Sequence, residues 1–133
     1  MSRERVRSDA ALLQRPGSAV RCVDQGETVV VILEPYLIPV PEIYEPEQVS
    51  SLAFTVPTTY PEAQPDPTGF YLLPSNIVIR SSRQPPESTA DGELLGAKWR
   101  KFSWAPKGAK WDPATDTLET YLSTVEARFL RRR

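Results

Sequence analysis

The absence of histidine and the presence of only one cysteine limit the chemistry that the side chains of this sequence can carry out. The chain of 133 residues contains no histidine and a single cysteine, Cys22. The common zinc sites therefore lose their usual ligands, and an internal disulfide is impossible. A serine or cysteine nucleophile paired with a histidine base is excluded for the same reason. We expect no metal and no cofactor.

One segment, residues 98–111 (KWRKFSWAPKGAKW), alternates basic and aromatic residues. Tryptophan and arginine are frequent anchors of protein–protein interfaces, and the same combination can bind nucleic acid through phosphate contacts and base stacking. The net charge of −1 weakens the nucleic-acid interpretation. We predict a surface that binds a protein partner, made by Trp99, Arg100, Lys101, Trp104 and Lys107.

A purely structural interpretation of the same segment competes with this one. Phe102 and Trp111 would then belong to the core beneath a terminal helix, and the lysines would only solvate a loop. The acidic segment 42–47 (EIYEPE) is interpreted as a solvated turn, because prolines flank it. Residues 22–79 contain no lysine or arginine, so the acidic first half of one copy could also attract the basic loop of another. Such a head-to-tail contact would produce self-association.

The N-terminal residues 1–16 have the pattern of a short helix. Val6, Ala10 and Leu13 recur at helical spacing, and Pro16 and Gly17 end the pattern. Because one face is apolar, we expect this helix to pack against a sheet.

Residues 19–73 have the pattern of a four-stranded antiparallel meander. Runs rich in β-branched residues occupy 19–24 and 27–39 around a predicted turn at Gln25-Gly26, and alternating runs occupy 50–57 and 69–74. Cys22 then lies within the first strand, where a small buried hydrophobe is the expected role.

The C-terminal third divides into a loop region and a helix. Residues 74–98 are polar and rich in Ser, Pro and Gly, so we predict a long loop within a loop region of residues 74–111. Asp112 and Pro113 have the types expected at a helix start, and an apolar face follows over 112–131, made by Leu118, Tyr121, Leu122, Val125 and Phe129. The whole chain, 1–133, is expected to form one α+β domain, and without an export signal or apolar span we expect it in the cytoplasm.

Two motifs resemble those of ubiquitin-conjugating enzymes, the UBC fold. Tyr60-Pro61 with Pro65 after a strand is similar to their "YP...PP" bend, and Trp111 with Pro113 is similar to their "WSPALTI" helix entry. The resemblance covers residues 19–130 and is closest to a bacterial group, prokaryotic family E. It gives the prolines a structural role, because a fixed φ and a missing N–H stop strand pairing.

The resemblance also implies a catalytic site that this sequence does not complete. A conjugating enzyme carries a His-Pro-Asn triplet and a cysteine eight residues before the tryptophan, where this chain has Ser103. We therefore expect a catalytically inactive protein that binds a ubiquitin-like protein noncovalently. The resemblance further implies an operon that encodes an activating-enzyme-like protein and a deubiquitinase-like peptidase, in some cases linked with phage defence. The alternatives are an active enzyme with Ser103 or Cys22 as nucleophile and, more weakly, nucleic-acid binding through the basic aromatic loop.

Overall fold

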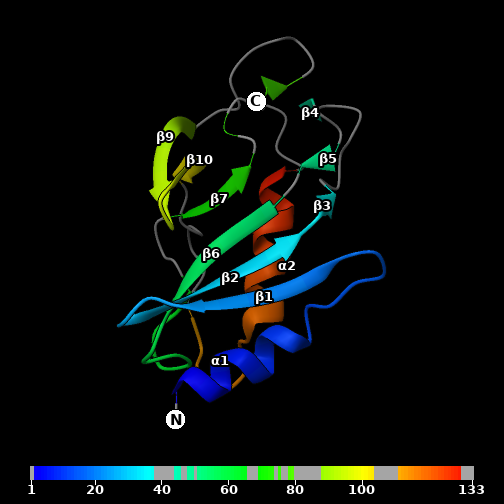
Figure 1. Cartoon of the computed structure of the whole chain (residues 1–133). Helices are drawn as coiled ribbons and strands as arrows, with labels where there is room; N and C mark the ends of the chain where they lie inside the picture. The colour runs from blue at the N-terminus through cyan, green and yellow to red at the C-terminus, as the bar shows by residue number, and fades with distance from the viewer. Residues whose placement is uncertain are drawn as a thin grey trace.

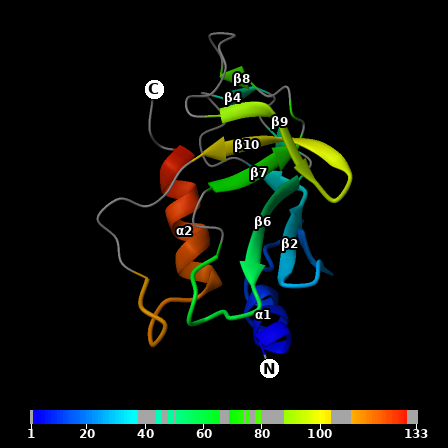
Figure 2. The same cartoon turned by 90° about the vertical axis from the view of Figure 1, so that its left-hand side faces the viewer.

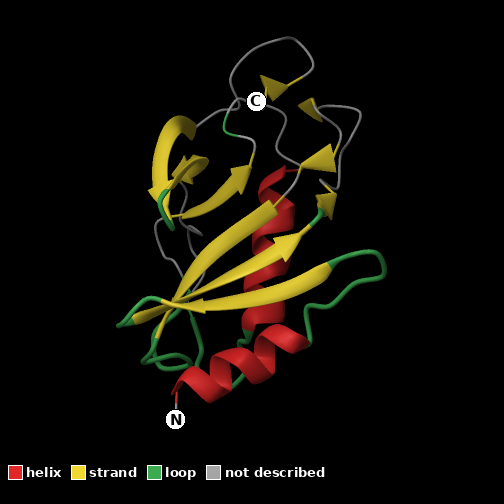
Figure 3. Ribbon diagram, viewed as in Figure 1, coloured by secondary structure: helices red, strands yellow, loops and turns green. Residues whose placement is uncertain are grey.

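The fold is α+β, with two helices packed on one face of an antiparallel sheet (Figure 3). The computed structural model describes residues 2–37, 44–45, 48–49, 51–65, 69–73, 75, 78–79, 88–103 and 111–129. The sheet has the strand order β1-β2-β6-β7-β10-β9, and two separate strand pairs, β3 with β5 and β4 with β8, lie beyond it (Figures 1 and 2). The predicted fold class is confirmed.

Helix α1 spans Ser2–Ala11, within the predicted range 1–16. Its three predicted apolar residues, Val6, Ala10 and Leu13, are all buried, the last of them in the turn that follows the helix. The chain then turns at Pro16-Gly17, where the Ser18 N–H donates to the carbonyl of Arg15 at 3.0 Å and Gly17 has φ +78°. A proline followed by a positive-φ glycine is the pattern of a type II turn.

The four strands of the predicted meander are confirmed as neighbours in the sheet. They are β1 (Ala19–Asp24), β2 (Thr28–Glu34), β6 (Ser51–Pro57) and β7 (Gly69–Leu73), and each pairs antiparallel with the next. Successive residues of a strand point to opposite faces, so the unbroken apolar run of β2 contributes to both faces. Val29, Val31 and Leu33 join the cluster under the helices, whereas Val30 and Ile32 join a second cluster on the other face.

The predicted long loop at residues 74–98 is wrong for its second half. Strands β9 (Ser88–Leu94) and β10 (Ala97–Ser103) form an antiparallel hairpin that extends the sheet beyond β7. Its two turn residues, Leu95 and Gly96, both have positive φ, 54° and 77°. That geometry is usually signalled by Asn-Gly or Asp-Gly, so Leu-Gly gives little sequence signal.

Two further features make this hairpin difficult to recognise from the sequence. Strand β9 is the edge of the sheet, and an edge strand can be polar because only one of its sides is paired. In β10 the charged Arg100 occupies a buried position on the same face as Phe102, where an apolar residue would be expected. The alternation that identifies a strand is therefore broken.

The short strands make two small ladders. Strand β3 (Tyr36–Leu37) pairs with β5 (Gln48–Val49), and β4 (Tyr44–Glu45) pairs with β8 (Val78–Ile79). Tyr36 is buried at the end of the main cluster.

The C-terminal helix is confirmed as α2, Leu118–Phe129, and it starts later than the predicted Asp112. Residues 112–116 form a turn instead, because the Asp112 side chain accepts the N–H of Ala114 and its carbonyl accepts the N–H of Asp116. The helix is capped by Thr117, whose N–H donates to the Thr120 hydroxyl at 2.8 Å. This bond is one of the two that make up a capping box, with threonine in place of the usual Glu or Gln.

The apolar face of α2 packs against the sheet as the sequence predicts. Leu118, Tyr121, Leu122 and Val125 are buried, and the Tyr121 ring lies 4.8 Å from the ring of Phe54 in β6. The side chain of Phe129 lies outside the described residues. Neither described helix is long and apolar enough to span a bilayer.

Candidate functional site

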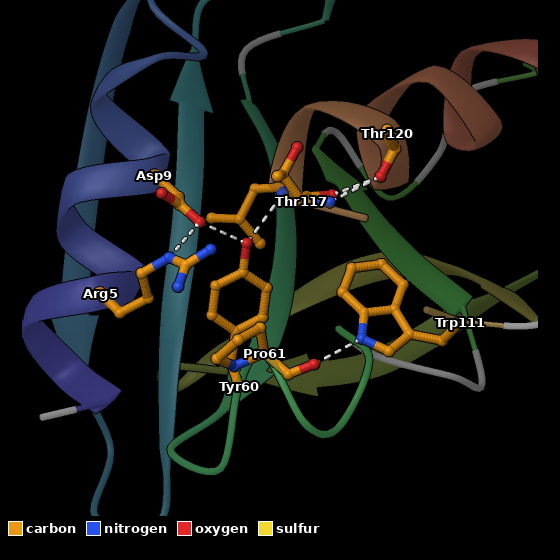
Figure 4. Close-up of polar contacts among 8 residues, drawn as sticks. Arg5, Asp9, Tyr60, Pro61, Trp111, Thr117 and Thr120 are labelled. Atoms are coloured by element: carbon orange, nitrogen blue, oxygen red, sulfur yellow. Dashed lines mark hydrogen bonds and ion pairs between the residues drawn. The ribbon is translucent and has the colours of Figure 1, made fainter. Parts of the chain in front are cut away.

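The residues of the two sequence motifs meet at the N-terminal end of α2 (Figure 4). The indole N–H of Trp111 donates to the carbonyl of Pro61 at 2.6 Å, and its ring lies 6.1 Å from the ring of Tyr60. Pro65 is buried, whereas Pro113 is exposed in the turn before the helix. The structure thus brings Tyr60, Pro61 and Trp111 together.

Tyr60 connects three elements through one hydroxyl group. The hydroxyl donates to a carboxylate oxygen of Asp9 in α1 at 2.6 Å and accepts the backbone N–H of Leu118 in α2 at 3.0 Å. Burial, followed by the Asp9 carboxylate, raises the pKa of Tyr60 above its usual value, so the phenol stays protonated and remains a donor. The Leu118 N–H is a first-turn donor without an intrahelical partner, and Tyr60 satisfies it.

Arg5 completes this arrangement from the surface of α1. Its guanidinium pairs with Asp9 at 2.9 Å and lies 5.7 Å from the centre of the Tyr60 ring. Neither Arg5 nor Asp9 is predicted as a functional residue by the motifs. Their spacing of four residues on a helix is the one signal that could have identified the ion pair.

Ser103 is the last residue of β10, and its backbone pairs with Gly69 at the start of β7. The carbonyl of Gly69 also accepts the hydroxyl of Tyr121 in α2 at 3.0 Å, which ties this end of the sheet to the helix. Residues 104–110 follow and lie outside the described part of the chain, with Trp104 and Lys107 among them. Ser103 therefore occupies a defined place in the sheet, on the strand that leads toward Trp111.

The structure buries two of the five predicted binding residues. Trp99 is 4% exposed and donates its indole N–H to the carbonyl of Leu94, while Arg100 is 3% exposed. The Arg100 guanidinium donates to the carbonyl of Ser75 at 2.9 Å and to the hydroxyl of Ser88 at 3.1 Å. The sequence does not predict this burial, because the pattern favours a loop here, whereas β10 directs the two side chains to opposite faces of the sheet.

Lys101 is the predicted binding residue that reaches the surface among those described. Its side chain is half-buried, and its ammonium group donates to the Tyr71 hydroxyl at 3.2 Å and lies 4.7 Å from the centre of that ring. The Tyr71 ring in turn meets Trp99 edge-on. A lysine and a tyrosine thus lie side by side on the face of the sheet opposite the helices.

Cys22 is half-buried in β1 and packs against the cluster under the helices. Burial is the largest influence on its thiol and raises its pKa above the ordinary value. Among the described residues, no group of three or more histidine, cysteine, aspartate or glutamate side chains is placed to hold a metal ion.

A shallow pocket of about 560 Å³ adjoins Trp111. It is lined by Thr28, Thr55, Pro57, Glu62, Ala63, Gln64 and Trp111. The proline bend, residues 60–65, supplies one wall, and the start of β2 and the end of β6 supply the other. The meander pattern predicts that β2 and β6 are neighbours, but it does not predict that Trp111 packs beside them.

The family of the chain follows from a comparison over almost its whole length. The sequence model of prokaryotic E2 family E matches residues 6–132. The chain belongs to this family. Comparisons with curated proteins and with solved structures found no match.

Membership of prokaryotic E2 family E confirms the resemblance to ubiquitin-conjugating enzymes. The family match includes Tyr60, Pro61, Trp111 and Ser103, so the contact around Tyr60 and the end of β10 both lie in the E2-like part of the chain. A ubiquitin-conjugating-like role, with ubiquitin-like proteins as the general class of partner, follows at the level of the family.

Proposed function

We propose that this member of prokaryotic E2 family E is a noncatalytic protein that binds a bacterial ubiquitin-like protein noncovalently. The observation that carries the proposal is the identity of residue 103. The resemblance places the thioester-forming cysteine at this position, eight residues before Trp111, and the chain has a serine there.

The chemistry of serine supports a noncatalytic role. A thiolate is both a good nucleophile and a good leaving group, whereas a serine hydroxyl needs an adjacent base to become nucleophilic. The chain has no histidine to serve as that base. The asparagine that would stabilise the developing oxyanion in the His-Pro-Asn triplet is missing as well.

Cys22 is a poor substitute for the missing cysteine. It lies in β1, and strands β2, β6 and β7 separate β1 from β10 in the sheet. Its raised pKa also lowers the fraction of thiolate at neutral pH. Activated cysteines are instead found near positive charge or at helix N-termini, where the pKa falls. An enzyme that uses Ser103 or Cys22 is therefore the second candidate function.

The proposed binding surface consists of Lys101 together with Trp104 and Lys107. Lys101 is supported by its position beside Tyr71 on the face of the sheet away from the helices. Trp104 and Lys107 remain in the proposal because their residue types suit an interface. Nucleic-acid binding through this region is a weaker alternative, because the buried Trp99 and Arg100 are not offered to a ligand.

The same proposal extends to the cellular context. A ubiquitin-like modification operon would encode the partner, an activating-enzyme-like protein and a deubiquitinase-like peptidase. Phage defence is one biological role that such an operon could have. Self-association through acidic and basic regions is a further proposal, for which salt-sensitive light scattering is the test.

A charge-reversal experiment tests the proposed surface. The purified chain is titrated with the ubiquitin-like protein encoded beside it, and affinity is compared for Lys101→Glu and Lys98→Glu. Lys98 is the matched control because it is exposed on the same strand and loses the same charge. The proposal predicts at least a tenfold loss for Lys101→Glu alone; no binding of the unmodified chain would refute it. An equal loss in both variants would reject Lys101 as a specific contact.

A further inference from the structure

A second pocket, separate from the contact between Tyr60 and Trp111, lies beside the later part of α2. It has a volume of about 380 Å³. The turn after α1, the end of β2, the start of β3 and one face of α2 surround it. Its lining residues are Arg15, Pro16, Gly17, Ser18, Leu33, Pro35, Tyr36, Leu122 and Glu126. Pockets of this size accommodate an amino-acid side chain or a small molecule.

Hydrogen bonds fix one wall of the pocket in place. The type II turn at Pro16-Gly17 is closed by the bond from Ser18 N–H to the Arg15 carbonyl. The Ser18 hydroxyl donates to the carbonyl of Pro35 at 2.8 Å, and the Gln14 amide donates to the carbonyl of Ser18. The turn is thereby tied to the end of β2, so the pocket is preformed and a ligand would not have to order it.

The inner surface combines apolar walls with one acidic group. Pro16 and Pro35 provide exposed apolar surface, whereas Leu33, Leu122 and Tyr36 are at most 6% exposed and form the packed wall behind it. The half-buried Glu126 accepts the Tyr36 hydroxyl at 3.4 Å. Among the side chains that the structure describes, no lysine or arginine forms an ion pair with Glu126.

We propose that this pocket binds a cationic alkyl group, an ammonium or guanidinium on an aliphatic stem of the kind found in lysine and arginine side chains. The stem would lie along Pro16 and Pro35, whose apolar surfaces are exposed, and the cation would pair with the carboxylate of Glu126. Long basic side chains bind in this way because their methylene groups are apolar while the end is charged.

The charges around the pocket favour a cation over an anion. Glu126 is half-buried, so its field is screened less than that of an exposed group, whereas the other charged lining residue, Arg15, is exposed. An anion would have to approach the carboxylate of Glu126, which would repel it. Arg15 moderates the affinity for a cation, so its removal should strengthen binding.

The test is a titration of the isotope-labelled full chain with Nα-acetyl-lysine methylamide, monitored by backbone amide shifts. Nα-acetyl-norleucine methylamide is the matched ligand control, because a methyl group replaces the ammonium. The proposal predicts saturable shifts around Gly17, Ser18 and Leu122 with the lysine compound and none with norleucine. Equal shifts with both compounds, or none with either, would overturn it.

Two variants locate the carboxylate that binds the cation. Glu126→Gln should lower the affinity for the lysine compound by about tenfold, which is the loss expected for a charged hydrogen bond. Glu119→Gln should leave this affinity unchanged. Glu119 is exposed on the same helix, so both variants lose the same charge. Arg15→Gln should tighten binding and gives a second readout if Glu126→Gln fails to fold. Weaker binding in Arg15→Gln would contradict the assignment.

A last comparison separates the two sources of such a group. Butylammonium carries the same charged stem without a peptide backbone. Binding of the lysine compound at least threefold tighter than butylammonium identifies a side chain of a protein as the ligand, and equal binding identifies a free amine. Saturable binding of butylammonium that survives Glu126→Gln unchanged would overturn the proposal.

Discussion

The hydroxyl of Tyr60 lies 2.6 Å from a carboxylate oxygen of Asp9, although 51 residues separate them in the sequence. The same hydroxyl accepts the N–H of Leu118, so one side chain joins α1, the proline bend and the start of α2. The Tyr60-Pro61 pair of the motif thus has a structural role here, which is to position the segment between the sheet and α2.

Replacing Tyr60 by phenylalanine should destabilise the fold without leaving a cavity. The change removes the partner of the buried Leu118 N–H and the donor to Asp9, and an unsatisfied buried group costs about 1–3 kcal/mol. The free energy of unfolding from urea denaturation measures this. Tyr71→Phe is the control, because its hydroxyl accepts a bond from the Lys101 ammonium group and not from a buried backbone N–H, so we expect a loss of about 0.5 kcal/mol. Equal losses in the two variants would argue against the special role of Tyr60.

Substitutions of the adjacent residues Arg100 and Lys101 should differ in their effect on the free energy of unfolding. Arg100 is 3% exposed and donates to Ser75 and Ser88, so Arg100→Ala should lower the free energy of unfolding by about 2 kcal/mol or more. Lys101→Ala should change stability by no more than about 1 kcal/mol, because its side chain reaches solvent. Thermal or urea unfolding of both variants provides the measurement. A stable Arg100→Ala protein would mean that Arg100 is not part of the folded core.

The thiol of Cys22 should react slowly at neutral pH. Burial raises its folded-state pKa, so iodoacetamide should alkylate the native chain more slowly at pH 7–8 than the urea-unfolded chain, and the rate should rise only in more alkaline solution. Fast alkylation of the native chain at pH 7 would indicate an activated thiolate and would favour Cys22 as a nucleophile.

The same raised pKa predicts how stability depends on pH. Because the folded thiol holds its proton more tightly than the unfolded one, its contribution is fully present below the unfolded pKa of about 8.5. It is then lost as pH rises through the folded-state pKa. A Cys22→Ala variant should therefore lose less stability than the parent chain between pH 8 and 10, and parallel pH profiles would contradict this.

Much of the fold could be predicted because the corresponding segments have regular apolar patterns. The buried face of α2 and the strands β1, β2, β6 and β7 all follow such patterns. The hairpin of β9 and β10 could not be predicted, because Arg100 interrupts the apolar alternation and Leu95-Gly96 is an unusual turn sequence. The sequence predicts too early a start for α2 because Asp112 and Pro113 resemble a helix cap, whereas Asp112 closes a turn of its own.

The candidate site was predictable only in part. The motifs identified Tyr60, Pro61 and Trp111, which do meet, but a motif gives no partners outside itself. Asp9 and Arg5 come from α1, and the contact depends on how the helix packs across the sheet. Glu126 and Tyr36 form the second pocket for the same reason, since 90 residues separate them in the sequence.

The most direct test of the proposed noncatalytic binding is the intact mass of this chain after co-expression with a bacterial ubiquitin-like protein and its activating enzyme. Mass spectra are recorded under native and under denaturing conditions on the same purified sample. We predict a complex in the native spectrum and only unmodified chains in the denaturing spectrum. A denaturant-stable adduct on this chain that disappears in Ser103→Ala or Cys22→Ala would contradict the proposal and identify the nucleophile.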